Sequence, residues 1–382
     1  MSTDQSVPEV YRQLGVQPVI HGAGTTTRYG GSLMRPEVIE AMQQASQAFV
    51  NIDELNAAAG EAIARMLGAE AALVTGGATS GLVLQAAACM TGDDADKIRR
   101  LPDTTGMKNE IIFQRAHRFQ YDQALRLAGA TLVEIGLGRS TTPVELECAI
   151  TDKTAAVFYL HSPFTNLPGL LSLDSMCEIA HARGVPVIVD AASMLPPRKH
   201  LFQHLRAGAD LVNFSGGKGI RGPQSTGILA GRKDLIRAAV LNGSPNSGVG
   251  RAAKTSKEEI VGLVKALELF LAADEDEEMN RYREVCTHIV DSVRDLEGLR
   301  AVVEQDPLNR VIPHAVIYFE SSWKGPSGQT VREALVAGTP CIYIQQGKVQ
   351  GGYFDEIAVD PINLQPGDEE IVARRLREEL TR

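Results

Sequence analysis

Short apolar runs alternate with amphipathic stretches through the first two thirds of the chain. Seven of these runs are expected to be strands, at residues 71–75, 111–114, 132–135, 154–160, 187–189, 211–214 and 227–229. Strands that alternate with helices form a largely parallel sheet with both faces covered. The pattern therefore predicts an α/β fold with a mainly parallel seven-stranded sheet.

Amphipathic periodicity marks the helices that connect the strands. They are expected at residues 8–14, 38–50, 53–67, 79–89, 121–127, 173–182 and 257–271. Ligands of such sheets bind beyond the carboxyl ends of the strands. Four of these ends carry polar or glycine-rich residues, so the candidate chemistry is expected there.

The glycine- and serine-rich residues 242–250 are the best candidate for a domain boundary. Beyond them, strands are expected near residues 315–319, 342–344 and 356–359, followed by a charged helix from Glu369. This order indicates a smaller α+β domain. We therefore expect an N-terminal segment at residues 1–50, a large domain at 51–248 and a small C-terminal domain at 249–382.

The composition of the chain argues against nucleic acids and membranes as binding partners. The chain has 382 residues, 44% of them hydrophobic, which is enough for two domains around a sizeable core. Its net charge is -9 and no block of lysine and arginine stands out, which argues against binding to nucleic acid. No apolar run is long enough to span a membrane, so no membrane partner is expected.

Cysteine and histidine usage indicates a cytoplasmic protein without a metal. The five cysteines are far apart and never in Cys-x-x-Cys spacing, which is typical of reduced thiols. Residues 1–6 lack the basic and apolar regions of a signal peptide. His200 and His204 have the spacing of a helical metal-binding pair, but no third ligand lies close in sequence. A surface pair is therefore expected.

The most informative stretch follows the apolar run 211–214. There the sequence reads Ser215-Gly-Gly-Lys218 and continues with more glycines and a proline. A lysine at a strand end among small residues can be desolvated, which lowers its pKa and makes the neutral amine a nucleophile toward a carbonyl. The alternative is a solvated loop lysine, the commoner state of a single lysine.

A second stretch of small residues, 75–81, lies between a strand and a helix. Its sequence, Thr-Gly-Gly-Ala-Thr-Ser-Gly, leaves backbone N–H groups free at the positive end of the helix, where a phosphate binds well. The alternative is a tight turn in which Thr79 or Ser80 caps the helix.

Two side chains at other strand ends complete the candidate site. Asp190 ends an apolar strand, where it either pairs with a protonated ring nitrogen or serves as a helix cap or salt-bridge partner. His117 follows the strand 111–114 and either lies over a planar ring or is an ordinary hydrogen-bonded or surface histidine. A phosphate seat, a carboxylate, a flat side chain and a reactive lysine together suit pyridoxal 5′-phosphate (PLP).

Several longer motifs carry a resemblance to a known family. They are residues 208–218 (Gly-Ala-Asp-Leu-Val-Asn-Phe-Ser-Gly-Gly-Lys) with Gly-Pro-Gln at 222–224, Asp-Ala-Ala at 190–192 with Leu-Pro-Pro at 195–197, residues 248–251 with 257–263, and residues 364–367. With these motifs the chain resembles the fold-type I PLP enzymes. It is most similar to the branch that contains bacterial selenocysteine synthase and D-glucosaminate-6-phosphate ammonia-lyase.

The resemblance implies a fold-type I PLP-dependent transferase fold and a role for each site residue. Lys218 would form the imine with PLP, Asp190 would pair with its ring nitrogen, Ala192 would pack under the ring and His117 would stack over it. The residues implied for the phosphate are Gly77, Ala78, Thr79 and Ser215. The family works as homodimers or larger homo-oligomers with sites at subunit interfaces, so a homo-oligomer is expected.

Four residues are candidates for binding the substrate. Arg28 and Tyr29 lie in a loop of small residues, and Arg198 and Arg221 lie near the predicted pocket. The guanidinium group of arginine can bind a carboxylate or a phosphate through two hydrogen bonds. The alternative for each of the four residues is an ordinary surface group.

The reaction expected from the resemblance is an α,β-elimination that releases ammonia from a small hydroxylated or phosphorylated amino acid. An aldolase or a racemase starts from the same chemistry, and a non-catalytic cofactor-binding protein is a further alternative. A role like that of selenocysteine synthase is discounted. The chain is acidic, and its catalytic pattern begins without the extra N-terminal tRNA-binding region of that enzyme.

Overall fold

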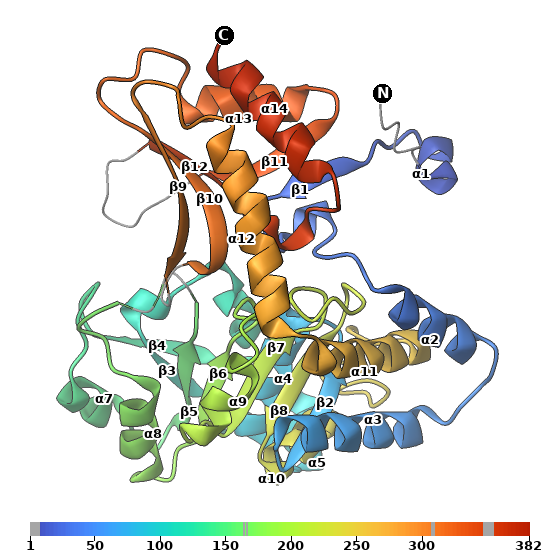
Figure 1. The fold of residues 1–382 in the computed structure, drawn as a ribbon. Coiled ribbons are helices and arrows are strands. Elements are labelled where there is room, and N and C mark those ends of the chain that lie inside the picture. Colours follow the sequence, from blue (N-terminus) through green and yellow to red (C-terminus); the bar gives the residue numbers. More distant parts are fainter. Residues whose placement is uncertain (1–7, 163–164, 166, 307–309, 347–354) are drawn as a thin grey trace. The chain divides into compact units, whose positions relative to one another are not determined.

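A computed structural model describes residues 8–162, 165, 167–306, 310–346 and 355–382 (Figure 1). The chain forms two compact units. The large unit is Ser32–Ala273, and the small unit combines Met1–Gly31 with Asp274–Arg382.

A seven-stranded sheet is the centre of the large unit. In spatial order its strands are β2 (Ala71–Thr75), β8 (Gly227–Gly231), β7 (Leu211–Ser215), β6 (Val187–Asp190), β5 (Thr154–Leu160), β3 (Glu110–Gln114) and β4 (Thr131–Ile135). All neighbours are parallel except those of β8, which runs against both β2 and β7. The sheet predicted from the sequence is confirmed.

Helices enclose this sheet. They are α2 (Pro36–Ser46), α3 (Ile52–Leu67), α4 (Ala78–Thr91), α5 (Ala95–Arg100), α6 (Gln123–Leu127), α7 (Pro143–Ala149), α8 (Leu173–His181), α9 (His200–Arg206), α10 (Lys233–Asn242) and α11 (Lys257–Ala272), with the short 3₁₀ helices η2 (Arg115–His117) and η3 (Gln120–Asp122). Consecutive strand residues such as Ile111, Ile112 and Phe113 are all buried, so both sheet faces are covered, as in other parallel sheets.

The small unit is built on a second sheet, in the order β1 (Val19–Gly22), β11 (Cys341–Gln346), β12 (Asp355–Val359), β10 (Arg310–Phe319) and β9 (Leu299–Asp306). Only β1 and β11 are parallel. Its helices are α1 (Glu9–Gln13), η1 (Thr27–Tyr29), α12 (Glu275–Asp291), α13 (Gly328–Ala337), η4 (Pro361–Asn363) and α14 (Asp368–Leu380). Figure 1 shows β1, in blue, beside strands of the red end of the chain.

The two units do not follow the domain limits expected from the sequence, which were residues 50 and 248. Strand β1 pairs with β11, so the first residues belong with the C-terminal sheet. Helix α11 packs against α2 and α3, so the large unit continues to Ala273. Both differences arise from contacts between segments far apart in sequence, which a reading along the chain does not detect.

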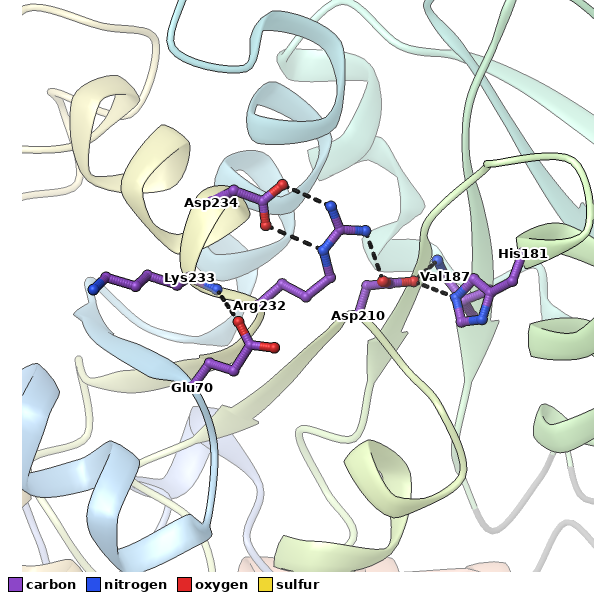
Figure 2. Close-up of polar contacts among 7 residues, drawn as sticks. All are labelled: Glu70, His181, Val187, Asp210, Arg232, Lys233 and Asp234. Atoms are coloured by element: carbon purple, nitrogen blue, oxygen red, sulfur yellow. Dashed lines mark hydrogen bonds and ion pairs between the residues drawn. The ribbon is translucent and has the colours of Figure 1, made fainter.

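An ionic cluster around the buried Asp210 lies at the amino-terminal edge of the large sheet (Figure 2). Asp210, directly before β7, accepts hydrogen bonds from Arg232 Nη1 (2.9 Å), His181 Nε2 (2.8 Å) and the Val187 N–H (2.7 Å). Arg232 also pairs with the exposed Asp234 at the start of α10. The cluster joins the starts of β6 and β7 to the end of β8, and thereby sets their register.

None of the helices in the described residues is both long and apolar enough to cross a membrane. All five cysteines are free thiols. Burial raises the pKa of Cys89, Cys177 and Cys286 to about 12, so these three are protonated at neutral pH.

Candidate active site

The loop that carries Lys218 is shaped by close backbone contacts. A side chain on Gly217 would overlap the backbone of Gln224, and one on Gly219 would overlap the carbonyl of Leu195. Ser32 Oγ donates to the carbonyl oxygens of Gly217 (3.1 Å) and Lys218 (2.8 Å). The glycines are therefore needed because the loop lies directly against neighbouring backbone, and the serine holds the loop in place.

The amine of Lys218 is mostly enclosed but has no close partner. Its Nζ forms no hydrogen bond or ion pair with any described residue. Burial lowers the pKa of Lys218, and the negative charge of Asp190 opposes that effect. The structure therefore shows a partly buried amine with an increased neutral fraction, rather than the solvated loop lysine that was the alternative.

Asp190 is the last residue of β6 and is buried. Its Oδ1 accepts the N–H of Ala192 at 2.9 Å. Burial raises its pKa to about 6, although the Ala192 N–H, the charge of Lys218 and the amide of Asn213 act in the opposite direction. Asp190 caps no helix and forms no salt bridge with a described residue, unlike the structural roles considered from the sequence.

The beginning of α4 has the free donors expected of a phosphate site. Gly77 is the N-cap residue, with φ 84°, and no side chain caps the helix. The N–H groups of the first turn, from Ala78 to Ser80, therefore have no partner within the helix. Thr79 and Ser80 do not cap the helix, which was the alternative role considered for them.

Ser215 and the beginning of α4 meet at the same edge of the sheet. Ser215 pairs with Gly227 across β7 and β8. A Cβ on Gly227 would lie 2.9 Å from the backbone nitrogen of Ala78. Only the backbone of Gly227 thus lies between Ser215 and the start of helix α4. Because β2, β6 and β7 run in the same direction, Asp190 at the end of β6 and Lys218 just after β7 lie at this edge too.

His117 is a buried, neutral histidine. Its Nδ1 accepts the N–H of Leu160 at 3.2 Å, so the ring proton is on Nε2. The edge of its ring packs with Tyr159 at 4.8 Å between centroids. Burial lowers the pKa of His117 to about 4. The structure thus shows a hydrogen-bonded histidine, and stacking over a cofactor stays a prediction.

The substrate candidates fall into two groups. Arg198 donates to the carbonyl of Ala273, and Arg221 Nε donates to that of Leu33 (3.0 Å), so both bind backbone of the large unit. Arg28 and Tyr29 belong to the small unit, where Arg28 is exposed and Tyr29 stacks on Tyr343 at 3.8 Å. Their role toward a substrate stays a prediction.

His200 and His204 are buried, so the expectation of a surface pair was wrong. His161, which follows β5, lies 2.8 Å from His204 Nε2 through its Nδ1 and contacts the ring of His200. His200 Nδ1 is bound to the carbonyl of Met194 (2.6 Å). Among the described residues no group of three acidic, cysteine or histidine side chains is placed to hold a metal ion.

The donor set at the carboxyl edge fits PLP. A partly buried amine suits its aldehyde, an incompletely bonded carboxylate suits its ring nitrogen, and free helix N–H groups suit its phosphate. Two supporting residues were missed by the sequence analysis: Ser32, because it lies far from the lysine in sequence, and Asn213, because it reads as part of an apolar strand.

Comparison with known proteins gives a family match, and two of the relatives have the same sequence identity to this chain. Residues 19–295 match the family described as SelA: L-seryl-tRNA selenium transferase. The chain is 34% identical to D-glucosaminate-6-phosphate ammonia lyase of Salmonella typhimurium (strain 14028s / SGSC 2262), over 97% of this chain and 98% of the relative. It is also 34% identical to 5′-C-glycyluridine monooxygenase-decarboxylase of a Streptomyces species, over 96% of this chain and 91% of that one.

Solved structures share the fold. The structure of D-glucosaminate-6-phosphate ammonia-lyase superposes with a TM-score of 0.84 at 34% identity and covers 98% of each chain. A structure of SPT with a PLP internal aldimine superposes with a TM-score of 0.61 at 12% identity, covering 94% of this chain and 87% of that one. The fold is therefore that of the fold-type I PLP enzymes, as predicted.

Proposed function

Because the chain belongs to the L-seryl-tRNA selenium transferase (SelA) family, we propose that it is a cytoplasmic PLP-dependent lyase that releases ammonia from a small amino acid. The observation that carries the proposal is the pair Lys218 and Asp190. Asp190 is buried and Lys218 is half-buried at the carboxyl edge of the large sheet, and no described residue neutralises either by direct contact.

The residues at this edge have separate roles in holding the cofactor. Lys218 would hold the aldehyde carbon and Asp190 the ring nitrogen. Gly77, Ala78, Thr79 and Ser215 would hold the phosphate, with the free N–H groups of Ala78 and Thr79 and the Ser215 hydroxyl as donors, since the Gly77 N–H is bonded to the Thr75 carbonyl (2.8 Å). Ala192 would pack below the ring and His117 above it. When bound, PLP supplies a ring that accepts electrons from the α-carbon of an amino acid.

Lys218 is the proposed acid and base. Because burial lowers its pKa, more of its amine is neutral near pH 7 and can accept the α-proton of the substrate. Once protonated, the same amine can donate to a hydroxyl that leaves the β-carbon. The charge of Asp190 limits the fall of this pKa, and so keeps the protonated form accessible.

The other two side chains complete the environment of the reaction. Asp190 has room for a charged partner because the hydrogen-bond donors to its carboxylate among the described residues are the Ala192 N–H and the Asn213 amide, both of which are neutral. Pairing with a cationic ring nitrogen would compensate the burial that raises its pKa. His117 stays neutral at physiological pH, so it adds no charge beside the ring.

The substrate class follows from the relative named as an ammonia lyase. We expect a small hydroxylated amino acid, with the phosphorylated amino-sugar acid in that relative's name as the first candidate. Loss of the β-hydroxyl as water gives an enamine, and its hydrolysis by water releases ammonia and leaves a keto acid. We also expect a homodimer or larger homo-oligomer, as in the family that the motifs resemble.

A second candidate comes from the Streptomyces relative, which is also 34% identical. Its name describes oxygenation and decarboxylation of a glycyl nucleoside. Oxidative decarboxylation of an amino acid consumes oxygen and releases carbon dioxide, whereas the elimination does neither. Aldol cleavage, racemisation, selenium transfer to a charged tRNA and cofactor binding without catalysis are further alternatives.

One screen separates these functions. Purified protein with PLP is incubated with D- and L-β-hydroxy amino acids and with amino-sugar acids, with and without phosphate, while keto acid, ammonia, oxygen, carbon dioxide and stereochemistry are followed. We expect keto acid and ammonia in equal amounts without oxygen uptake. Oxygen uptake with carbon dioxide would instead support the second candidate. No turnover of any amino acid would overturn both.

A further inference from the structure

A fully buried amide lies in the middle of β7, between apolar residues. Asn213 is completely enclosed, as are Leu211, Val212 and Phe214. An amide in such a place destabilises the fold unless its polar atoms are bonded. Asn213 Oδ1 nevertheless has no hydrogen-bond partner among the described residues. An apolar side chain of similar size would avoid this unsatisfied oxygen, so the amide needs an explanation other than stability.

One side of this amide holds the phosphate end of the proposed site. Asn213 Nδ2 donates to the carbonyl of Ala78, the first residue of α4, at 2.9 Å. A side chain on Gly81, one turn later, would overlap Asn213 Oδ1. The first turn of α4 therefore rests directly on the amide, which fixes how far that turn lies from β7.

The other side of the Asn213 amide faces the carboxylate of Asp190. Asn213 pairs with Asp190 across β6 and β7, so the two side chains project from the same face of the sheet. The amide is one of the groups that favour the charged form of Asp190. Asn213 therefore contacts the first turn of α4 and acts on Asp190.

We propose that Asn213 is a positioning residue that sets the distance and orientation between the phosphate-binding turn of α4 and the carboxylate of Asp190. This inference rests on the proposed function, because the spacing matters only if one ligand spans both groups. Asn213 itself needs no contact with that ligand.

Asn242 provides a matched control at the other end of the same helix. It is also completely buried, its Nδ2 donates to Thr91 Oγ1 (2.9 Å) and the Ala238 carbonyl (3.0 Å), and its Oδ1 has no partner among the described residues. Thr91 is the last residue of α4. Asn242→Leu thus removes an equivalent amide from the helix end that lies away from the site.

The test measures binding of PLP and of pyridoxal, which lacks the phosphate, to cofactor-free parent, Asn213→Leu and Asn242→Leu. We expect Asn213→Leu to raise the Kd for PLP about tenfold, as for loss of one buried hydrogen bond, and to bind pyridoxal with less change. PLP binding is expected to weaken at low pH as Asp190 becomes protonated. We expect the pH midpoint of this loss to be higher in Asn213→Leu, because a donor that favours the charged form of Asp190 is lost. Asn242→Leu should match the parent in all three measurements.

The outcomes separate this inference from the proposed function. Failure of the parent to bind PLP would overturn both. A different result would overturn the inference alone. In that case the parent binds PLP, and Asn213→Leu and Asn242→Leu have the same Kd for PLP, the same preference for PLP over pyridoxal and the same pH midpoint of binding. Urea unfolding of each variant checks the fold, and Asn213→Ala, which adds no bulk beside Gly81, replaces the leucine variant if that one unfolds.

Discussion

The large sheet carries a buried aspartate at each edge, and the two are treated differently. Asp210 at the amino edge is bonded by an arginine, a histidine and a backbone N–H. Asp190 at the carboxyl edge has one backbone N–H and the neutral Asn213 amide, and the nearby Lys218 forms no ion pair with it. The folded chain therefore supplies charged partners to the carboxylate of Asp210 but none in direct contact with the carboxylate of Asp190.

This difference separates a structural ion from a functional one. A buried charge whose partners come from the chain contributes to a defined fold, whereas one without partners raises the free energy of the folded state until a ligand supplies them. Perturbed ionisable groups of this second kind cluster at active sites. Four predictions test the contrast, in order of decreasing expected effect.

Replacement of the lysine should have the largest effect. Lys218→Ala is expected to lose the visible absorbance of the PLP imine and to lower kcat at least about 10⁴-fold, because it removes the group that binds the cofactor and transfers the proton. Lys257→Ala is the control, since Lys257 is also shielded but is bonded to Glu258 and the Ala45 carbonyl. Retention of imine absorbance in Lys218→Ala would show that another lysine is used.

Replacement of the two aspartates should give opposite results. Asp190→Asn is expected to keep the fold and bind PLP but to lower kcat about 10³-fold, because asparagine cannot keep the ring nitrogen protonated. Asp210→Asn is expected to lower the free energy of unfolding by about 2 kcal/mol through loss of a buried bonded charge, with little change of kcat. Equal losses of activity in both variants, measured on folded protein, would remove the distinction between the edges.

The stability of cofactor-free protein should depend on the charge of Asp190. Its pKa is raised from 3.8 to about 6, so the folded state binds more protons than the unfolded state between these values. The contribution of this carboxyl group to the free energy of unfolding is therefore greatest below pH 4. It falls by about 3 kcal/mol as the pH rises through 6. Urea unfolding of parent and Asp190→Asn at pH 4.5 and 7.5 measures about 2 kcal/mol of this difference, because the unfolded carboxyl group is already mostly ionised at pH 4.5. An equal pH dependence in the two proteins would mean that Asp190 does not titrate as stated.

The smallest effect concerns the arginines. Arg28 is exposed and forms no hydrogen bond with a described residue, whereas Arg198 is bonded to the Ala273 carbonyl. We expect Arg28→Ala to raise KM for an anionic substrate about tenfold without changing the cofactor spectrum, and Arg198→Ala mainly to lower stability. Unchanged kinetics in Arg28→Ala would move the anion site to another residue.

Much of the large unit could be predicted because its signals are local. Strands β2 and β5 begin and end at the predicted residues, and Lys218, Asp190 and the start of α4 are marked by small or charged residues directly after apolar runs. The edge strand β9 was missed because its residues are mostly only half-buried and give no clear alternation. Helix α9 begins only at His200, after Pro196 and Pro197, since prolines disfavour helical backbone in the residues before them.

What could not be predicted depends on partners distant in sequence. The bond between Asn213 and Ala78 spans 135 residues, and that between His161 and His204 spans 43. In the sequence Asn213 is one polar residue in an apolar run, and His161 is a single histidine after a strand. Only the folded chain shows that each belongs to a buried polar group near the candidate site.

The identity of the residue that binds PLP tests the central claim most directly. The parent protein is incubated with PLP, reduced with borohydride and digested, and the modified peptide is identified by mass spectrometry. We predict one major adduct, on Lys218. A major adduct on any other lysine, or no adduct under conditions that keep the protein folded, would contradict the account.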